Sequence, residues 1–434
     1  MKKIVYLISV VFFTFQIPLW ADTNELYLQL SGQNQSQPLL NVAFPPFIAR
    51  PMGQKKTALM AHELWGVVRA DLLMSRYFNV LENGPLFNGS NAREIASVWR
   101  KKGASFLMTA EVSQALDQLQ ITVHLLDLNS GSLILGHFYK GPADSWRAMA
   151  HQISDEIVRA LTGKPGIAHT RIAFSNDQTT HKEIYLIDYD GENLRRLTWD
   201  HSIDILPRFT PDGQKIVYTS YKNGNPDLFI LDLKPGSRPQ PFSSYQGLNI
   251  AGGFSPNGDK ILMTLSRGKS PNIYVKNLVN GRLTQLTNDR GADSSPTFSP
   301  DAGQIAFVSD RVGNPEVYIM DLLTGGAKRL TMLNWCDSPS WSPTGQWITF
   351  AGRVSPTDKL DILLTDITGT DERDITHGNG SSENPSWSPD GRFIVFSRTG
   401  KNGISRLYVM DADGSAPHAL SKIRGNSATP TWSR

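Results

Sequence analysis

A short motif, P-x-[FW]-[ST]-P-x-G, recurs through the C-terminal part of the chain, and this repetition constrains the fold more than any other feature. Successive copies start 45, 44, 43, 46 and 45 residues apart. The six copies begin at Pro207, Gly252, Pro296, Pro339, Pro385 and Pro430. Four β-forming segments at a period of roughly 40 to 50 residues are typical of a β-propeller blade. Residues 171–434 number 264, so the repeat predicts six blades of 44 residues.

Each position of the motif has a physical role. The second Pro presets φ for a turn, and Gly permits the conformation that completes it. The aromatic residue is expected to pack between neighbouring blades. The copy at Pro296 carries Ala302 where four other copies have Gly, with Gly303 one place later. We therefore expect a distorted turn in that copy.

The two ends of the repeat region complement each other. The repeat region begins at Arg171 without a P-x-[FW] strand, while the last copy, residues 430–433, has no strands after it. An unpaired strand edge is a liability that natural sheets avoid. We expect residues 430–433 to pair with the strand at Ile172 and close the ring.

The N-terminus has the pattern of a cleaved signal peptide. Lys2 and Lys3 precede an apolar run of 16 residues, 4–19, and Ala21 is the small residue that a signal peptidase requires. The run is shorter than the ~20 residues that span a bilayer, which disfavours the alternative of an uncleaved anchor. Residues 1–21 are therefore interpreted as a signal peptide, and the exported chain has no direct membrane insertion.

Residues 22–163 alternate between periods of two and 3.6, which predicts an α/β domain. Helices are expected around residues 61–76, 95–99 and 146–161, and a hairpin is expected from residues 119–125 and 133–139. Residues 164–170 contain Pro165 and Gly166 and form the predicted linker to the propeller at residues 171–434. The expected fold class is an α/β domain followed by an all-β six-bladed propeller with four strands per blade.

Charge and cysteine content exclude several functions. The chain has 43 Lys and Arg against 40 Asp and Glu, a net charge of +3, which is too small for a surface that binds nucleic acid or anionic membranes. Cys336 is the single cysteine, which excludes an intramolecular disulfide and a zinc site built on several cysteines. We expect a monomer in which Cys336 is a packed small residue.

No motif for catalysis or a cofactor is present. The chain lacks a G-x-S-x-G nucleophile elbow, and His62-Glu63 is not followed by the second His of a zinc hydrolase. Aspartates also recur after one strand in five of the six repeats, and because they follow the blade period they are interpreted as turn residues. These aspartates are Asp188, Asp232, Asp321, Asp366 and Asp411. The sequence favours a binding platform over an enzyme.

Polar residues just before the P-x-[FW] strands form the main candidate site. They are Asp204, Asn249, Asp293, Asp337 and Glu383. If they meet at one mouth of the ring, the four carboxylates repel each other, and Ca²⁺ or a basic side chain of a partner would relieve that repulsion. The four acids are therefore candidate calcium ligands, with a solvated acidic rim as the alternative. A hydrolase or lyase that uses these acids is the alternative function, and a lectin-like module is a third class.

Residues after Ala21 alternate in polarity. Leu26, Leu28 and Leu30 alternate with Tyr27 and Gln29. Such a segment suits strand addition to a partner, and an ordinary edge strand of the first domain is the alternative.

The signal peptide, the helix 61–76 followed by Tyr77-Phe78-Asn79-Val80-Leu81, and the six repeats together resemble the TolB family, the periplasmic component of the Tol-Pal system. The resemblance implies a non-enzymatic protein of the Gram-negative periplasm that supports outer-membrane integrity and constriction at cell division. It implies binding of the lipoprotein Pal at the propeller mouth and of TolA through residues 22–34. Other outer-membrane lipoproteins are further candidate partners.

The resemblance also assigns residues to these partners. The implied Pal-facing set is Asp204, Leu248, Asn249, Ala251, Asp293, Ser294, Ser295, Asp337 and Glu383. The implied TolA-facing set is Glu25, Leu26, Tyr27, Leu28 and Leu30. Two positions depart from the family pattern, since this chain has Leu248 where relatives place His and Ser295 where they place Glu.

Overall fold

The computed structural model describes residues 38–86, 92–420 and 423–434, which belong to the compact unit Pro38–Arg434. The predicted signal peptide and the predicted TolA-binding segment lie outside these residues. None of the helices in the described part of the chain has the length and apolar character needed to cross a membrane.

The first part of the chain folds as a mixed sheet with helices on both faces. Its strands are β1 (Leu40–Ala43), β2 (Ile48–Arg50), β3 (Phe78–Leu81), β4 (Phe106–Ala115), β5 (Gln118–Asp127) and β6 (Leu133–Pro142). Its helices are α2 (Lys55–Met74), α3 (Ala92–Lys101), the 3-10 helix η1 (Ala143–Ser145) and α4 (Trp146–Thr162). The sheet order is β3-β1-β4-β5-β6, with β2 paired to β4. The three predicted helices and the predicted β5–β6 hairpin are confirmed.

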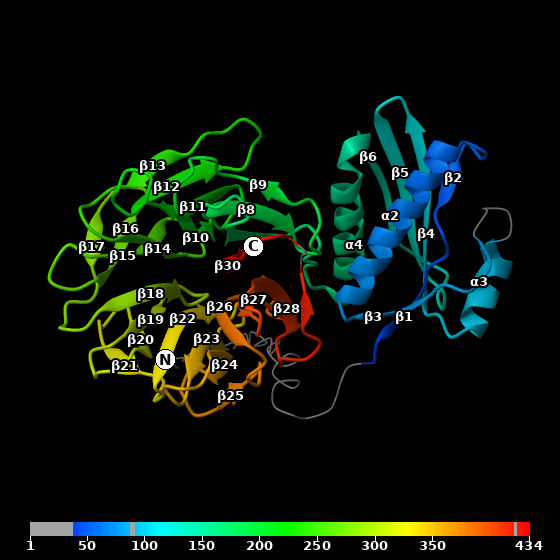
Figure 1. The fold of residues 1–434 in the computed structure, drawn as a ribbon. Helices are drawn as coiled ribbons and strands as arrows, with labels where there is room; N and C mark the ends of the chain where they lie inside the picture. The colour runs from blue at the N-terminus through cyan, green and yellow to red at the C-terminus, as the bar shows by residue number, and fades with distance from the viewer. Residues whose placement is uncertain (1–37, 87–91, 421–422) are drawn as a thin grey trace, which may run out of the picture. The chain divides into compact units, whose positions relative to one another are not determined.

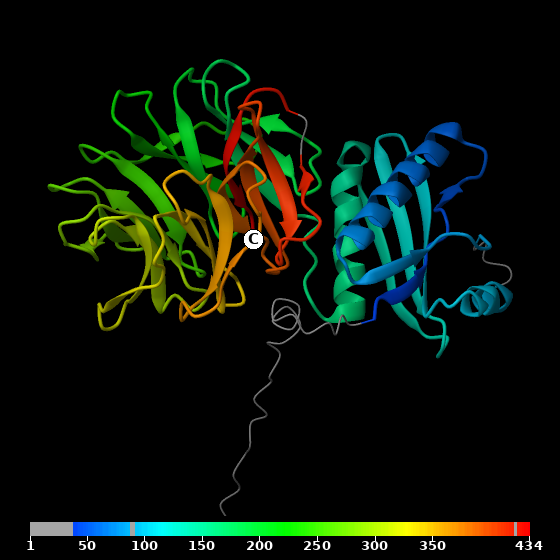
Figure 2. The ribbon, with the colours of Figure 1, turned by 60° about the horizontal axis from the view of Figure 1, so that its bottom comes forward.

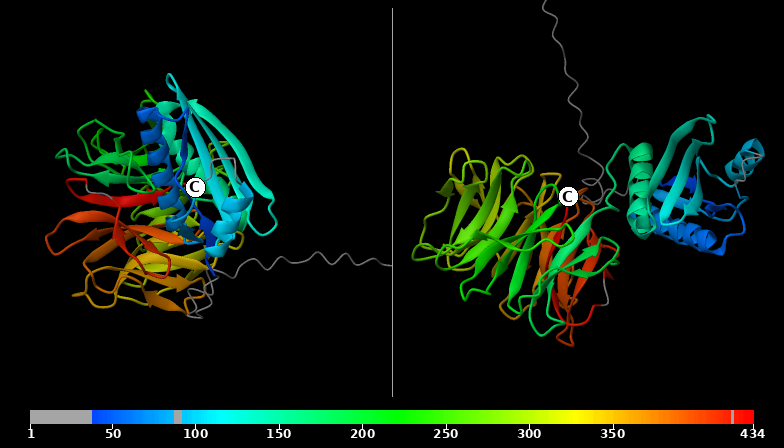
Figure 3. Two further views of the ribbon diagram at one scale, coloured as in Figure 1. Left: turned by 90° about the vertical axis from the view of Figure 1, so that its right-hand side faces the viewer. Right: turned by 90° about the horizontal axis from the view of Figure 1, so that it is seen from above.

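Alternation along the strands assigns the two faces of this sheet. Val42 and Met108 belong to the core beneath α2 and α4, whereas their neighbours Ala43 and Leu107 belong to a second core with Trp99 of α3. Successive strand side chains point to opposite faces, so each helix layer receives every second residue. Figures 1 and 3 show α4 and α3 on opposite sides of the sheet.

The second part of the chain forms six four-stranded sheets around a central axis (Figures 1 and 2). The first blade holds β10 (Asp204–Phe209), β11 (Lys215–Ser220), β12 (Asp227–Asp232) and β13 (Gln240–Ser243). The second holds β14 (Asn249–Phe254), β15 (Lys260–Leu265), β16 (Asn272–Asn277) and β17 (Leu283–Gln285), and the third holds β18 (Asp293–Phe298), β19 (Gln304–Ser309), β20 (Glu316–Asp321) and β21 (Ala327–Arg329). The fourth holds β22 (Trp335–Trp341), β23 (Trp347–Arg353), β24 (Asp361–Asp366) and β25 (Glu372–Asp374), and the fifth holds β26 (Ser381–Trp387), β27 (Phe393–Thr399), β28 (Ser405–Asp411) and β29 (His418–Ala419).

The sixth blade joins the two ends of the repeat region. It holds β30 (Ser427–Trp432), β7 (Arg171–Asn176), β8 (Glu183–Asp188) and β9 (Arg195–Arg196), in that order. Trp432 pairs with Ile172 in an antiparallel register. The predicted closure of the ring is therefore confirmed, as is the predicted fold class.

The motif aromatics pack between blades, as predicted. They are Phe209, Phe254, Phe298, Trp341, Trp387 and Trp432, all buried. Phe254 of the second blade, for example, packs with Val217 and Leu228 of the first. Burial of one aromatic side chain per blade interface stabilises the ring, because such a side chain removes a large apolar area from water.

The expected distortion at Ala302 is wrong. The amide of Ala302 donates to the carbonyl of Ser299 at 2.9 Å, as that of Gly213 donates to Thr210 at 2.8 Å. Ala302 reaches this geometry by adopting φ +58°, close to the +63° of Gly213. Alanine can enter this region at a cost of about 1 kcal/mol, which the packing of the repeat offsets.

A buried carboxylate links α2, α4 and the loop after β8. Asp71 accepts hydrogen bonds from Tyr189 Oη at 2.6 Å and from Ser154 Oγ at 2.7 Å. The oxygen that accepts from Ser154, Oδ2, also lies 2.9 Å from His151 Nδ1. Burial by itself lowers the pKa of His151, but the hydrogen bond and charge of Asp71 together with the charge of Asp190 raise it above its ordinary value. Because a carboxylate can only accept, Nδ1 of His151 carries a proton and serves as the third donor to Asp71.

The repeated aspartates and Cys336 have structural roles. Asp321 and Asp366 accept backbone amides of their own turns, as the turn interpretation predicted. Cys336 is fully buried in β22, and burial raises the pKa of its thiol, in agreement with the prediction of a packed small residue.

The axial channel of the propeller as the candidate binding site

Six strands line the axis of the propeller, one from each blade. Neighbouring members of the set β10, β14, β18, β22, β26 and β30 contact one another all the way around the ring. Each has a break in register with the next strand of its blade. In five of them the residue before the motif Pro has a positive φ of 51 to 55°. These five residues are Leu206, Ser295, Ser338, Asn384 and Thr429.

Hydrogen bonds connect these bulges between adjacent blades. Ser295 Oγ donates to Asp337 at 3.2 Å, and Asn384 Nδ2 donates to Ser338 Oγ at 2.9 Å. The amide of Leu206 donates to Thr429 Oγ1 at 3.4 Å. Bulges are typical of positions where a strand must redirect a side chain, and here they recur where the strands face the channel. The bonds fix the shape of the channel wall.

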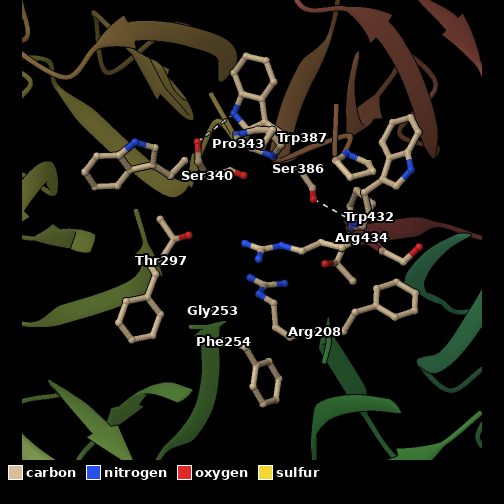
Figure 4. Close-up of a pocket in the computed structure, with 18 of the residues that line it drawn as sticks. Arg208, Gly253, Phe254, Thr297, Ser340, Pro343, Ser386, Trp387, Trp432 and Arg434 are labelled. Atoms are coloured by element: carbon tan, nitrogen blue, oxygen red, sulfur yellow. Dashed lines mark hydrogen bonds between the residues drawn. The ribbon is translucent and has the colours of Figure 1, made fainter. Parts of the chain in front are cut away.

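Below the bulges, the channel holds a cavity of about 180 Å³. The residue between Pro and the aromatic of each motif copy lines it. These residues are Arg208, Gly253, Thr297, Ser340, Ser386 and Thr431. Arg434 lines the same cavity, and Figure 4 shows the side chains of Arg208 and Arg434 pointing into it. The cavity wall therefore combines two guanidinium groups with small side chains.

Of the two arginines that line the cavity, Arg208 is partly buried and Arg434 is exposed. Burial lowers the pKa of Arg208 to about 10, although the charge of Asp337 acts in the opposite direction. A pKa near 10 leaves the guanidinium protonated at neutral pH. Its side chain donates to the backbone oxygen of Pro207 at 2.9 Å.

The structure buries three of the residues predicted at the propeller mouth. Asp204, Asn249 and Asp293 have no exposed surface. Asp293 forms an ion pair with Arg311 at 3.1 Å, and the amide group of Asn249 is hydrogen-bonded to Ser243 Oγ and to backbone groups of its own loop. Asp293 and Asn249 are therefore bound within their blades, and none of the three buried side chains reaches a ligand in the channel.

The other predicted mouth residues differ in exposure. Leu248, Ser294, Ser295, Asp337 and Glu383 are partly exposed, while Ala251 is buried. Burial raises the pKa of Asp337, with hydrogen bonds from Ser338 N and Ser295 Oγ in partial compensation. Asp337 and Glu383 stand two residues before their motif Pro, whereas Asp204 and Asp293 stand three before it. An offset of one residue turns a strand side chain to the opposite face, which explains the two groups.

The four predicted calcium ligands do not come together. Among the described residues, no three of Asp204, Asp293, Asp337 and Glu383 have carboxylate oxygens within 4.8 Å of one another. Asp204 instead lies with Glu183 and Asp200. Arg196 pairs with Glu183 at 2.7 Å and Lys222 with Asp200 at 3.1 Å. Basic side chains thus already neutralise two carboxylates of this group.

The third carboxylate of this group belongs to Asp204, and it makes the free energy of unfolding depend on pH. Burial raises the pKa of Asp204 to about 7, well above the ~3.9 of an unfolded aspartate. Between these values the folded state binds more protons than the unfolded state, so stability falls as pH rises from about 4 to 7. We expect Asp204→Asn, which introduces the residue found at Asn249 in the next blade, to raise the free energy of unfolding by about 2 kcal/mol at pH 8 and to change it little at pH 4.

Urea unfolding of the two proteins at both pH values checks this expectation. Asp117 is exposed, so Asp117→Asn is the control for loss of a carboxylate as such. A wild-type stability that does not change between pH 4 and 7, or an equal gain from both substitutions, would contradict the role given to Asp204.

Sequence reasoning missed most of the residues that face the channel cavity. Of the residues predicted at the mouth, Ser295 lines the cavity, whereas most of the cavity wall comes from within the motif. An alignment of the six copies contains the relevant signal, because the position between Pro and the aromatic is Gly, Ser or Thr in five copies and Arg208 in one. A single large cation among five small residues marks the position as exceptional.

Comparison with known families identifies the family to which the chain belongs. A model described as the TolB beta propeller domain matches residues 158–434, which is more than half of the chain, and a model of the TolB amino-terminal domain matches residues 31–134. The chain belongs to the TolB family. The resemblance inferred from its sequence is thereby confirmed.

Individual TolB relatives agree with this assignment. The Tol-Pal system protein TolB of Desulfosudis oleivorans is 35% identical over 215 residues, covering 47% of this chain and 49% of the relative. That of Roseobacter denitrificans is 32% identical over 222 residues, covering 49% and 50%. The chain thus spans about half the length of the curated relatives that it matches. The crystal structure of TolB from Acinetobacter baumannii superposes with a TM-score of 0.77 at 28% identity and covers 91% of this chain and 97% of that one.

Proposed function

We propose that this TolB-family chain is a non-enzymatic periplasmic interaction platform of the Tol-Pal system. It binds the peptidoglycan-associated lipoprotein Pal at the mouth of the propeller and TolA through residues 22–34. In this role it maintains outer-membrane integrity and supports outer-membrane constriction at cell division. The observation that carries the proposal is the pair of TolB family matches, to residues 31–134 and 158–434.

The described geometry supports binding more than catalysis. Asp204 and Asp293, two of the acids named for a hydrolase or lyase, have no exposed surface. A general acid or base must come within hydrogen-bond reach of its substrate, so these two cannot serve at the mouth. Ser294, Ser295 and Leu248 are partly exposed there and are the residues that we assign to contact with Pal.

A pull-down tests the proposal. Tagged mature chain, residues 22–434, is incubated with cross-linked envelope extract, and retained proteins are identified by mass spectrometry. We expect recovery of a peptidoglycan-associated lipoprotein and at least a tenfold loss of it with Ser294→Arg, because a long cation on β18 blocks close approach to the mouth.

The matched control is Ser237→Arg, which places the same side chain on an exposed turn between β12 and β13. It should retain the lipoprotein at the wild-type level. Failure of the wild-type chain to retain any such lipoprotein would remove the proposed function, and equal loss with both variants would remove the assignment of the binding face.

A further inference from the structure

The channel cavity has an unusual charge distribution. Arg208 and Arg434 are the charged side chains among the described residues that line it, and no Asp or Glu side chain of those residues lines it. If the first blade carried Gly, Ser or Thr at position 208, as the other motif copies do, the channel would have one positive charge fewer and would be wider. The first blade instead places a guanidinium there.

The charge of Arg208 has no close counter-ion in the described part of the chain. No carboxylate oxygen of the described residues lies within the 4.0 Å of an ion pair, and the side-chain hydrogen bond of Arg208 goes to the backbone of Pro207. Asp337 is the acid whose charge acts on Arg208, but its carboxylate accepts hydrogen bonds from Ser295 Oγ and Ser338 N. A partly buried guanidinium without a paired anion is unfavourable, so an anion in the cavity would stabilise the folded state.

The size and wall of the cavity fit a small oxyanion. Its volume of about 180 Å³ equals that of several water molecules at ~30 Å³ each. Thr297, Ser340 and Ser386 place hydroxyl groups on the same wall. Guanidinium forks and hydroxyls are the donors that carboxylate and phosphate groups bind.

We propose that the axial cavity is an oxyanion-binding site in which Arg208 and Arg434 bind a phosphate or carboxylate group. The oxyanion is either a free small molecule or an acidic side chain that a protein bound at the mouth inserts into the channel. The site itself does not depend on the proposed function, whereas the second source of the anion does.

Inorganic phosphate serves as the probe. Thermal unfolding and calorimetric titration of mature chain are carried out in a phosphate-free buffer of low ionic strength. We expect phosphate at about ten times its Kd to raise the unfolding midpoint by about 3 °C. Arg208→Ser, which introduces the residue found at Ser340 and Ser386, should weaken phosphate binding about 10- to 100-fold.

Two further variants make the result specific. Arg434→Ser should also weaken phosphate binding, and it keeps the test available if Arg208→Ser does not fold. Arg282 is exposed on the turn between β16 and β17, so Arg282→Ser is the control and should bind phosphate as the wild type does. Equal responses of the wild type, Arg208→Ser and Arg434→Ser, or no response of the wild type, would overturn the proposal.

Binding of the purified lipoprotein separates the two sources of the anion. If the partner supplies the acid, phosphate competes with the lipoprotein and Arg208→Ser weakens the complex. If a free anion is the ligand, phosphate binds as expected and lipoprotein affinity is the same for wild type and Arg208→Ser. Absence of any lipoprotein binding would contradict the proposed function and leave the phosphate result to decide the site.

Discussion

Replacement of Trp432 by alanine is expected to lower the free energy of unfolding by about 4 kcal/mol. Trp432 is 5% exposed and lies in the core between the fifth and sixth blades, with Ile172 and Phe393. Its indole Nε1 donates to Thr170 Oγ1 at 2.8 Å. Truncation leaves a cavity and removes this buried hydrogen bond at the interface where the C-terminal strand closes the ring. Urea unfolding followed by tryptophan-independent circular dichroism measures the change.

Trp199 offers a matched control because it is 62% exposed. Trp199→Ala removes the same side chain from the surface and should cost less than about 1 kcal/mol. Deletion of residues 427–434 removes all of β30 and should prevent cooperative folding of the propeller. If Trp432→Ala is no more destabilising than Trp199→Ala, the closing strand does not hold the ring together.

Replacement of Asp71 by alanine is expected to cost about 3 to 5 kcal/mol. Asp71 is 4% exposed and accepts from Tyr189, Ser154 and His151. Removal of the carboxylate leaves the buried donors of Tyr189 and His151 without this acceptor, while Ser154 Oγ keeps only its bond to the backbone oxygen of Ala150. Because buried donors without partners cost more than their hydrogen bonds contribute, the loss exceeds that of an ordinary surface substitution.

Two further substitutions isolate the cause. Glu63 is exposed on the same helix, α2, and Glu63→Ala should change stability by less than about 0.5 kcal/mol. Tyr189→Phe removes one donor and leaves the carboxylate, so it should cost about 1 kcal/mol. If the free energy of unfolding of Asp71→Ala lies within 1 kcal/mol of the wild-type value, the network is not a main contributor to stability.

Repeats and turns of the propeller were predictable because they depend on local sequence. The motif interval determined the number of blades, and the absence of a P-x-[FW] strand before Arg171 predicted the pairing of Trp432 with Ile172. The turn at Ala302 was not predictable from residue preference. There the tertiary packing of the repeat imposes a positive φ on alanine, at a cost smaller than that of losing the repeat geometry.

The candidate site was predictable in its place but not in its residues. Asp204 and Asp337 look equivalent in the sequence because both precede a motif Pro. They differ by one residue in distance from that Pro, and the alternation of a strand therefore buries Asp204 and leaves Asp337 partly exposed. The bulge before each Pro adds a further shift that spacing alone does not reveal.

The sequence by itself determined the architecture of this TolB-family chain, since the motif period, the turn residues and the alternating apolar positions are local properties that add up along the chain. Only the tertiary structure determined which side chains come together at one site. Arg208 and Arg434 are 226 positions apart in the sequence, yet ring closure brings both to one cavity. Such convergence depends on the register and twist of six separate sheets, and no single segment of the chain encodes it.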